Sequence, residues 1–381
     1  MAVWKAHSVR EAVRQGWDGL VHPDDLFRTP GWLSLESEQT NLPPVFYFAG
    51  DQEGNPAAAL PCFPLDVASE AWPFMRADLL LRQLADGYGL PVEDGVGTAV
   101  DALLPTYLCG GRRVPDTGVL TAPDCPEDRR PRLVDELVAA AEDDARENAV
   151  ASVSFLFVAE SDQDLRQTLR NRGYAEFPTA RYSTLHLPGP GFEAYLGLIA
   201  ANRRRKLRYE RRQLAEAGVT FAAEPLTPEL TRELVPLLQQ HGSKYGHAYA
   251  EESLTRNLEL HDRHCGDDLR VITGRSADGV VRGFSLVVHR GSRLYVRQTG
   301  YDYAWQGKLP LYFALCYYEP VEYASRVGAT ALDYAVASEA TKLSRGCTLE
   351  QRYGYLKAFD DKTGSEAGRL LDAIRQAAAE G

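Results

Sequence analysis

Apolar residues in two parts of the chain form paired runs that are separated by short polar turns. Residues 45–65 contain two such runs around a turn at 51–55, and residues 269–289 repeat the arrangement around a turn at 277–279. Short apolar runs divided by Asp, Asn and Gly are typical of β-hairpins. The pattern therefore predicts one hairpin in each half of the chain.

Each predicted hairpin is followed by the same order of further elements. A strand, a helix and a strand are expected next, at 105–109, 131–148 and 151–158 in the first half and at 293–300, 309–327 and 330–337 in the second. The first half continues with a helix at 162–171 and a strand at 181–187. This repetition predicts an α/β (α+β) protein with two copies of one unit, each a mixed, mostly antiparallel sheet flanked by helices.

The segment 188–191, PGPG, marks the predicted boundary between the copies, because Pro removes backbone donors and Gly loosens the chain. We expect an N-terminal domain at 1–190, a basic linker helix at 191–218 and a C-terminal domain at 219–381. Residues 66–104, rich in Asp, Gly and Pro, are expected to be an insertion in the first copy. A terminal helix is expected from residue 361 onward.

One long helix is expected from about 192 to 217. Its segment 202–212, NRRRKLRYERR, has seven Lys or Arg against one Glu, a local charge of +6 in a chain of formal charge −11. A charge run is usually only the solvated face of a helix, yet so many like charges at i, i+3 and i+4 repel each other. The cluster predicts a site for the phosphates of a donor such as coenzyme A, or for an RNA backbone. The residues expected to bind these phosphates are Arg203, Arg204, Arg205, Lys206, Arg208, Arg211 and Arg212.

Composition indicates an ordinary globular chain. It has 381 residues, 44% of them hydrophobic and 25% charged, which is consistent with two or three domains. Because no apolar run has the length of a signal peptide or a membrane span, we expect a cytoplasmic protein without membrane insertion. The six cysteines are scattered without metal-ligand spacing, so neither a metal site nor a disulfide framework is expected.

Three segments of the second half follow the pattern of a known family. They are SKYGHAY at 243–249, LCYYEPVEYA at 315–324, and LDYA at 332–335 followed by KLSRG at 342–346. Together with the basic segment, they resemble the FemAB-like proteins labelled peptidoglycan biosynthesis or recognition proteins. The order of elements resembles tandem acyltransferases of the GNAT superfamily, in its FemABX-like branch. The resemblance implies transfer of an aminoacyl or acyl group to an amine, with no permanently bound cofactor.

The expected donor follows from a departure from the GNAT pattern. GNAT enzymes that use acetyl-CoA have a Gln/Arg-x-x-Gly-x-Gly/Ala loop whose backbone amides hold the pyrophosphate. Here 297–302 reads RQTGYD, with Tyr301 and Asp302 where small residues belong. The FemABX branch takes its acyl group from aminoacyl-tRNA. Aminoacyl-tRNA is therefore the expected co-substrate and tRNA the expected partner, with acyl-CoA as the alternative.

Amide formation needs a base, donors to an oxyanion and a proton for the leaving group. The expected catalytic residues are Glu319 and Glu322, three apart on a predicted helix, Lys342 and Arg345 in a loop after a strand, and His247. Ordinary surface charge is the plainer interpretation of each. The residues expected to bind substrate are Lys244, Tyr245, Tyr249, Tyr301, Tyr317 and Tyr318.

The predicted function is an aminoacyltransferase that forms an amide bond, moving an aminoacyl group from aminoacyl-tRNA to the amine of a peptide, a cell-wall precursor or a small secondary metabolite. An acyl-CoA-dependent N-acyltransferase is the first alternative. A non-catalytic RNA- or peptide-binding module is the second. The sequence leaves open the acceptor, the transferred group and the oligomeric state.

Overall fold

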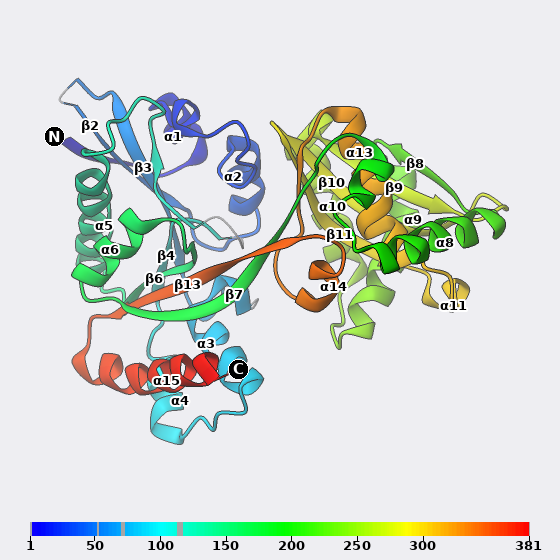
Figure 1. The fold of residues 1–381 in the computed structure, drawn as a ribbon. Coiled ribbons are helices and arrows are strands. Elements are labelled where there is room, and N and C mark those ends of the chain that lie inside the picture. Colours follow the sequence, from blue (N-terminus) through cyan, green and yellow to red (C-terminus); the bar gives the residue numbers. More distant parts are fainter. Residues whose placement is uncertain (1, 52, 70–72, 113–116, 381) are drawn as a thin grey trace. The chain divides into compact units, whose positions relative to one another are not determined.

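The computed structural model describes residues 2–51, 53–69, 73–112 and 117–380. The chain divides into two compact units (Figure 1): unit 1 contains Met1–Tyr182 and Glu350–Gly381, and unit 2 contains Ser183–Leu349. This division differs from the expected domains at 1–190 and 219–381. The basic helix belongs to unit 2, and the last strand and helix of the chain return to unit 1.

Unit 1 contains a sheet in the order β1-β2-β3-β4-β6-β13-β7. The pairs β1·β2, β2·β3, β3·β4 and β6·β13 are antiparallel, and β4 and β6 run parallel. The short strand β5 pairs with β3. The strands are β1 (Ala2–Ala6), β2 (Val45–Gly50), β3 (Pro56–Leu65), β4 (Thr106–Cys109), β5 (Leu120–Thr121), β6 (Ser152–Ala159), β13 (Thr348–Ala358) and the first part of β7 (Ala175–His186).

The helices of unit 1 include α5 and α6, which lie side by side (Figure 1). Leu133, Leu137 and Ala141 of α5 are buried in the same apolar core as β2 and β3. The helices are α1 (Val9–Arg14), η1 (Trp17–Leu20), α2 (Pro30–Ser37), η2 (Pro73–Met75), α3 (Ala77–Gly87), α4 (Asp94–Asp101), α5 (Arg130–Glu147), α6 (Gln163–Asn171) and α15 (Asp361–Glu380).

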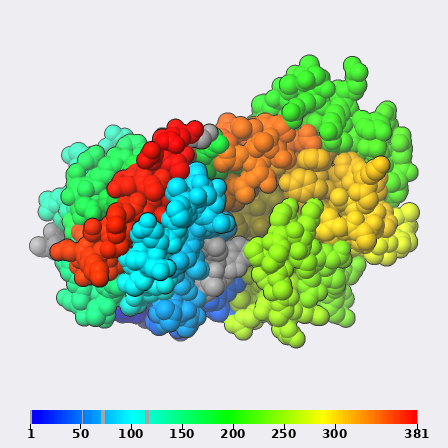
Figure 2. All heavy atoms as spheres, turned by 90° about the horizontal axis from the view of Figure 1, so that it is seen from below, coloured from blue at the N-terminus to red at the C-terminus, as the bar shows by residue number. Residues whose placement is uncertain are grey.

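The insertion at 66–104 has a structural role that the sequence did not reveal. Its helices α3 and α4 pack against the terminal helix α15. Figure 2 shows this contact on the surface, with α15 in red beside the cyan helices. The segment therefore supplies a cover for the C-terminal helix within unit 1.

Unit 2 contains the strands that follow in the same hydrogen-bonded order, β7-β12-β11-β10-β9-β8. Only β11 and β12 pair in parallel, and the other pairs are antiparallel. The predicted arrangement of each unit, a mixed and mostly antiparallel sheet with flanking helices, is thus confirmed. The strands are β8 (Thr220–Glu224), β9 (Leu269–Arg275), β10 (Val281–Arg290), β11 (Arg293–Tyr301), β12 (Ala331–Asp333) and the end of β7.

The helices of unit 2 lie on both faces of this sheet. Leu237 of α9 lies against the sheet at Gly300, whereas Leu311 and Leu315 lie against it at Gly283, on the opposite face. The helices are α7 (Gly191–Leu196), α8 (Ala201–Glu216), α9 (Pro228–Lys244), α10 (Glu251–Cys265), η3 (Gly266–Asp268), α11 (Tyr303–Gln306), α12 (Leu311–Phe313), η4 (Ala314–Tyr318), α13 (Glu319–Val327) and α14 (Glu339–Leu343).

Three expected elements differ from the structure. The expected helix at 192–217 is two helices, because Ala200 has an extended backbone (ψ 139°) and starts a new helix. The expected helix at 309–327 contains a π-helical turn at η4, just before Pro320, which lacks the N–H that an α-helical bond requires. The expected strand at 330–337 is only β12, which ends at Asp333.

Candidate functional site

The parallel strands of unit 2 separate after a short pairing. β12 pairs with β11 only at Arg293, Leu294 and Tyr295. Beyond this point the chain after β12 follows β7 instead, since Tyr334 N donates to Ser183 O at 3.0 Å and Ser183 N donates to Ala335 O at 2.9 Å. Separation of two parallel strands leaves one side of β11 without a strand neighbour.

We call residues 296–299 of β11 the open edge. Among the described strands, β10 is the only partner of this part of β11. All four of its residues are half-buried, although β11 lies in the middle of the sheet. Backbone amides and carbonyls at an unpaired edge are available to a ligand.

An aromatic cluster continues from the end of β11. The Tyr301 side chain is fully buried, its ring lies 5.8 Å from the ring of Tyr312, and its hydroxyl lies 3.1 Å from Cys316 Sγ. Burial raises the pKa of the Cys316 thiol to about 11, so the thiol is neutral at physiological pH. Tyr317 extends the cluster to Tyr334, with 5.0 Å between ring centroids. The structure thus brings together two of the expected substrate-binding residues, Tyr301 and Tyr317.

His241 of α9 lies beside this cluster and was missed by the sequence analysis. Its Nδ1 is 2.7 Å from the Tyr303 hydroxyl. Burial, and secondarily the charge of Lys244, lowers the pKa of His241, so its imidazole is neutral near pH 7. Burial raises the pKa of Tyr303 to about 12, so its hydroxyl keeps its proton. A neutral imidazole bonded to a protonated phenol can pass a proton in either direction.

The other residues of the expected segment 243–249 lie near the end of α9. Lys244 Nζ lies 4.1 Å above the ring of Tyr303, and the ring of Tyr245 is 5.1 Å from that of His241. His247 and Tyr249 form a separate ring pair, with centroids 5.8 Å apart. The one sequence signal for His241 was its place two residues before SKYGHAY.

Lys342 lies in a short helix, α14, where a loop was expected. It is 6% exposed and donates to the carbonyls of Tyr334 at 2.6 Å, Ala335 at 3.2 Å and Val336 at 2.7 Å. Burial lowers the pKa of Lys342 to about 8. Its ammonium is therefore already engaged by backbone acceptors.

The segment held by Lys342 has an unusual backbone. Ala335, Ala337 and Ser338 have φ values of 53°, 67° and 52°, in the left-handed region that side chains disfavour. Strain of this kind persists only where the surroundings enforce it, and it gathers at functional sites. The three bonds from Lys342 supply that enforcement next to the point where β11 and β12 separate.

Arg345 and Glu210 form a buried ion pair. Arg345 is 3% exposed, its Nη2 is 3.4 Å from Glu210 Oε2, and its guanidinium lies 4.1 Å from the ring of Phe313. The expected substrate-binding residue Tyr318 donates its hydroxyl to the same Glu210 oxygen. This network joins α8 to the η4 turn, and it turns Arg345 and Tyr318 away from solvent.

The two expected catalytic glutamates meet the basic helix. Arg211 Nη1 lies 3.0 Å from Glu322 Oε1, and its Nη2 lies 3.6 Å from Glu319 Oε1. The Arg211 guanidinium also lies 4.4 Å from the ring of Phe192. Burial raises the pKa of Glu319, while Arg211 opposes the shift. These residues form a group of their own.

The seven cations of α8 differ in their surroundings. Arg204 donates to the Ile199 carbonyl at 2.8 Å, and Arg208 lies 2.7 Å from Glu193. Lys206 and Arg212 lie 3.8 and 3.7 Å from acids one turn away. Arg203 and Arg205 are exposed, and neither has an acidic partner among the residues that the structure describes.

Asp302, directly after β11, is bonded within the chain at its side chain and its backbone. Asp302 Oδ1 accepts from Trp305 N at 3.0 Å, and its Oδ2 lies 3.0 Å from Arg282 Nη1. Asp302 N itself donates to Arg282 O at 2.8 Å. The amides of Asp302 and Trp305 are thus bonded within the chain.

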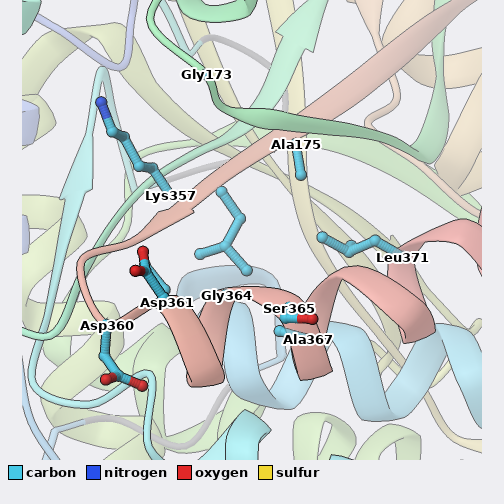
Figure 3. A pocket seen from close by; sticks show the side chains of 11 residues that line it. Gly173, Ala175, Lys357, Asp360, Asp361, Gly364, Ser365, Ala367 and Leu371 are labelled. Carbon is cyan, nitrogen blue, oxygen red and sulfur yellow. The ribbon is translucent and has the colours of Figure 1, made fainter.

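The described cavities lie elsewhere. Figure 3 shows one of about 260 Å³ in unit 1, between β13 and the start of α15, with Asp360 and Asp361 at its wall. A second, of about 410 Å³, lies near Arg146 and Phe359 of the same unit. Asp360 lines both cavities, and hydrogen bonding from Thr363, first through its backbone amide, lowers the pKa of this carboxyl. Among the described residues there is no group of His, Cys, Asp and Glu suited to a metal ion, and no helix is long and apolar enough to span a membrane.

Comparisons with known proteins address the fold and the family. The crystal structure of FemX is similar over 98% of this chain and 100% of that chain, with a TM-score of 0.60 and 13% identity. The C-terminal domain of a putative lysylphosphatidylglycerol synthetase from Agrobacterium fabrum is similar over 96% of each chain, with a TM-score of 0.54 and 13% identity. A tandem GNAT protein from the clavulanic acid biosynthesis pathway is similar over 94% of this chain and 98% of that chain, with a TM-score of 0.52 and 14% identity.

These likenesses confirm the tandem GNAT-like fold. No curated protein matches the chain. A family model described as peptidoglycan biosynthesis/recognition, FemAB-like, matches residues 114–380. The match spans most of the chain and includes all of unit 2, so the protein belongs to the FemAB-like family.

Proposed function

We propose that this protein is an aminoacyltransferase, which moves an aminoacyl group from aminoacyl-tRNA to an amine and so forms an amide bond. Family and fold indicate a transferase. The choice of aminoacyl-tRNA as the donor goes beyond what family and fold indicate. The observation that carries it is α8, where the exposed Arg203 and Arg205 have no acidic partner within the described residues. Such cations favour a polyanion.

The chemistry that we propose takes place at the open edge and the neighbouring His241–Tyr303 pair. The acceptor nitrogen attacks the ester carbonyl of the aminoacyl group, a C–N bond forms, and the C–O bond to the ribose breaks. One proton leaves the amine and one is needed by the leaving hydroxyl. A neutral His241 can accept the first, and the hydrogen-bonded Tyr303 hydroxyl, 2.7 Å away, can pass a proton onward.

The predicted catalytic residues stay proposals, and their contacts favour different roles. Lys342 and Arg345 have buried partners, which favours shaping of the site over contact with substrate. Glu319 and Glu322 bind Arg211, which favours a role in holding α8. His247 lies near the end of α9, where it can contact an acceptor.

An acyl-CoA donor is the second candidate. The separation of β11 and β12 favours it, since an extended acyl chain can lie against an unpaired strand. The bonded amides around Asp302 speak against it, because they are not free to hold a pyrophosphate. The acceptor that we propose is the amine of a cell-wall precursor, of another peptide or of a small metabolite.

The experiment is a transfer assay with two donors. Purified protein is incubated with labelled aminoacyl-tRNAs or with labelled acyl-CoAs, together with amine and peptide acceptors. Label that leaves tRNA faster than spontaneous hydrolysis, and enters an RNase-resistant product, is the expected result. Release of free coenzyme A with tRNA untouched would move the protein to the acyl-CoA class. Binding of RNA or peptide without any transfer would contradict an enzymatic role.

A further inference from the structure

The outer face of α8 combines cations with an exposed aromatic ring. Leu207, Glu210 and Leu214 form the buried stripe of this helix. Arg205, Tyr209 and Arg212 are spaced by four and three residues, so they project together on the opposite face. The helix therefore presents a row of cation, ring and cation to solvent.

Tyr209 has no packing role that explains its position. It is 48% exposed, although it follows buried Leu207 by two residues and precedes buried Glu210. Its hydroxyl has no hydrogen bond among the described residues. The Arg212 guanidinium carbon lies 5.5 Å from the centroid of the Tyr209 ring. An exposed ring beside a guanidinium offers a flat surface on which a base can stack.

The cations beside Tyr209 are weakly engaged. Arg205 has no acidic partner within the described part of the chain. Arg212 lies 3.7 Å from Glu216, and both side chains are about two-thirds exposed, so water screens this pair. By contrast, the partly buried Arg211 has two acidic partners. Arg205 and Arg212, whose charges are available to a polyanion, therefore lie on the face that also contains the ring, whereas Arg203 precedes buried Leu207 by four residues and lies on another row.

We propose that Tyr209 is a stacking platform for an unpaired base of the RNA donor, and that Arg205 and Arg212 bind the phosphates on either side of that base. This inference rests on the proposed function and deepens it, since it names a single-stranded segment as the part of the RNA that α8 binds. A double helix hides the faces of its bases, whereas a single strand exposes them. The single-stranded 3′ tail of tRNA has the required chemistry.

The salt dependence of RNA binding distinguishes the contribution of base stacking from that of phosphate contacts. The probe is an acceptor-stem RNA hairpin that has a single-stranded 3′ tail and carries no amino acid. Its Kd is measured between low and physiological salt. We expect Tyr209→Ala to weaken binding about 5- to 20-fold with an unchanged slope of log Kd against log salt. Arg205→Gln is expected to reduce the magnitude of that slope by about 0.7, the value for one phosphate contact to a single strand.

The controls test geometry and specificity. Tyr209→Phe keeps the ring and is expected to bind as the wild type does, and a blunt hairpin without the tail is expected to bind equally to wild type and Tyr209→Ala. Tyr88→Ala, at a 41% exposed tyrosine of unit 1, is the matched control and is expected to have no effect.

Three outcomes would overturn the proposal. Tail binding that is unchanged by Tyr209→Ala would overturn the platform while leaving the tRNA donor in place. If Tyr209→Ala weakens binding of the tailed and the blunt hairpin equally, the ring does not recognise a single strand. Absence of RNA binding by the wild type, with binding to phosphatidylglycerol vesicles instead, would overturn both this inference and the proposed donor.

Discussion

Each unit contains a pair of parallel strands at the same place in its order of elements. The course of the chain after that pair differs between the two units. In unit 1, β4 pairs with β6 over Thr106–Leu108, and the chain then returns: Thr117 bridges Val158 of β6, and β5 pairs with β3. In unit 2 the chain after β12 follows β7 and does not return to β11. One unit closes its separated pair with its own backbone, and the other leaves it open.

The contrast extends to burial. Phe155, Leu156, Phe157 and Val158 of β6 are all buried in unit 1, whereas residues 296–299 of β11 are half-buried in unit 2. Buried strand groups are satisfied within the sheet, and half-buried ones can accept a ligand. We therefore propose that the fold serves as a scaffold in unit 1 and carries the site in unit 2.

The largest effect is expected from substitution of His241, the proposed base in unit 2. His241→Gln is expected to lower kcat/KM for transfer by about 10²- to 10⁴-fold, because glutamine cannot take up a proton. Steady-state transfer assays and urea unfolding together measure this, and the free energy of unfolding is expected to change little. His247→Gln is the matched control. If the His247 variant loses activity and the His241 variant does not, the base has been assigned to the wrong histidine.

The second effect concerns the strained segment at 335–338, which follows the point where β11 and β12 separate. Lys342→Met removes the donor to three carbonyls and is expected to lower the free energy of unfolding by about 2–4 kcal/mol. Urea denaturation measures the loss. The kcat of the molecules that remain folded is expected to fall much less than in the His241 variant. Unchanged stability with abolished kcat would instead establish direct contact between Lys342 and substrate.

The third effect lies in the closed pair of unit 1. Gly110 has φ +85°, and a Cβ there would lie 2.8 Å from Thr117 Cγ2, so Gly110→Ala is expected to cost about 2–4 kcal/mol of stability. Gly173→Ala is the matched control, because Gly173 has φ +80° with open space around it, and about 1–2 kcal/mol is expected there. Activity per folded molecule is expected to be unchanged in both. A specific loss of kcat in the Gly110 variant would place chemistry in unit 1.

The smallest effect is a pH dependence. Because the pKa of His241 is lowered, its neutral form persists below the ordinary value of about 6.5, and kcat/KM is expected to fall only as the pH drops below that value. The His241→Gln variant is expected to lack this acid limb. A wild-type midpoint well above 6.5 would point to another group as the base.

Local patterns predicted the hairpins well and the site poorly. β2 and β3 join through a turn in which Asp51 Oδ1 accepts from Asn55 N at 2.9 Å, a bond between residues four apart. Such signals are contained in short stretches of sequence. The family pattern also led to Lys342 and Arg345, but their charge suggested exposure, and their partners lie on segments distant in sequence or in a turn that only the fold creates.

The residues that were missed depend on tertiary contacts. His241 is one of several polar residues on α9, and only the approach of Tyr303 gives it a proton partner. In unit 1, the contact of the returning chain with β6 depends on residues that follow Gly110 and Gly111. In unit 2, the separation of β11 and β12 depends on Ser183, which pairs with the chain after β12. Pairings between distant segments are not encoded in local periodicity.

The most direct test of the central claim is hydrogen exchange of the backbone amides, with and without a non-hydrolysable aminoacyl-tRNA mimic whose ester is replaced by an amide. The account predicts slower exchange on binding for peptides that cover residues 296–299 of β11, and unchanged exchange for peptides that cover Thr106–Cys109 of β4. Protection of the unit 1 peptides, with residues 296–299 unchanged, would contradict the assignment of the site to unit 2.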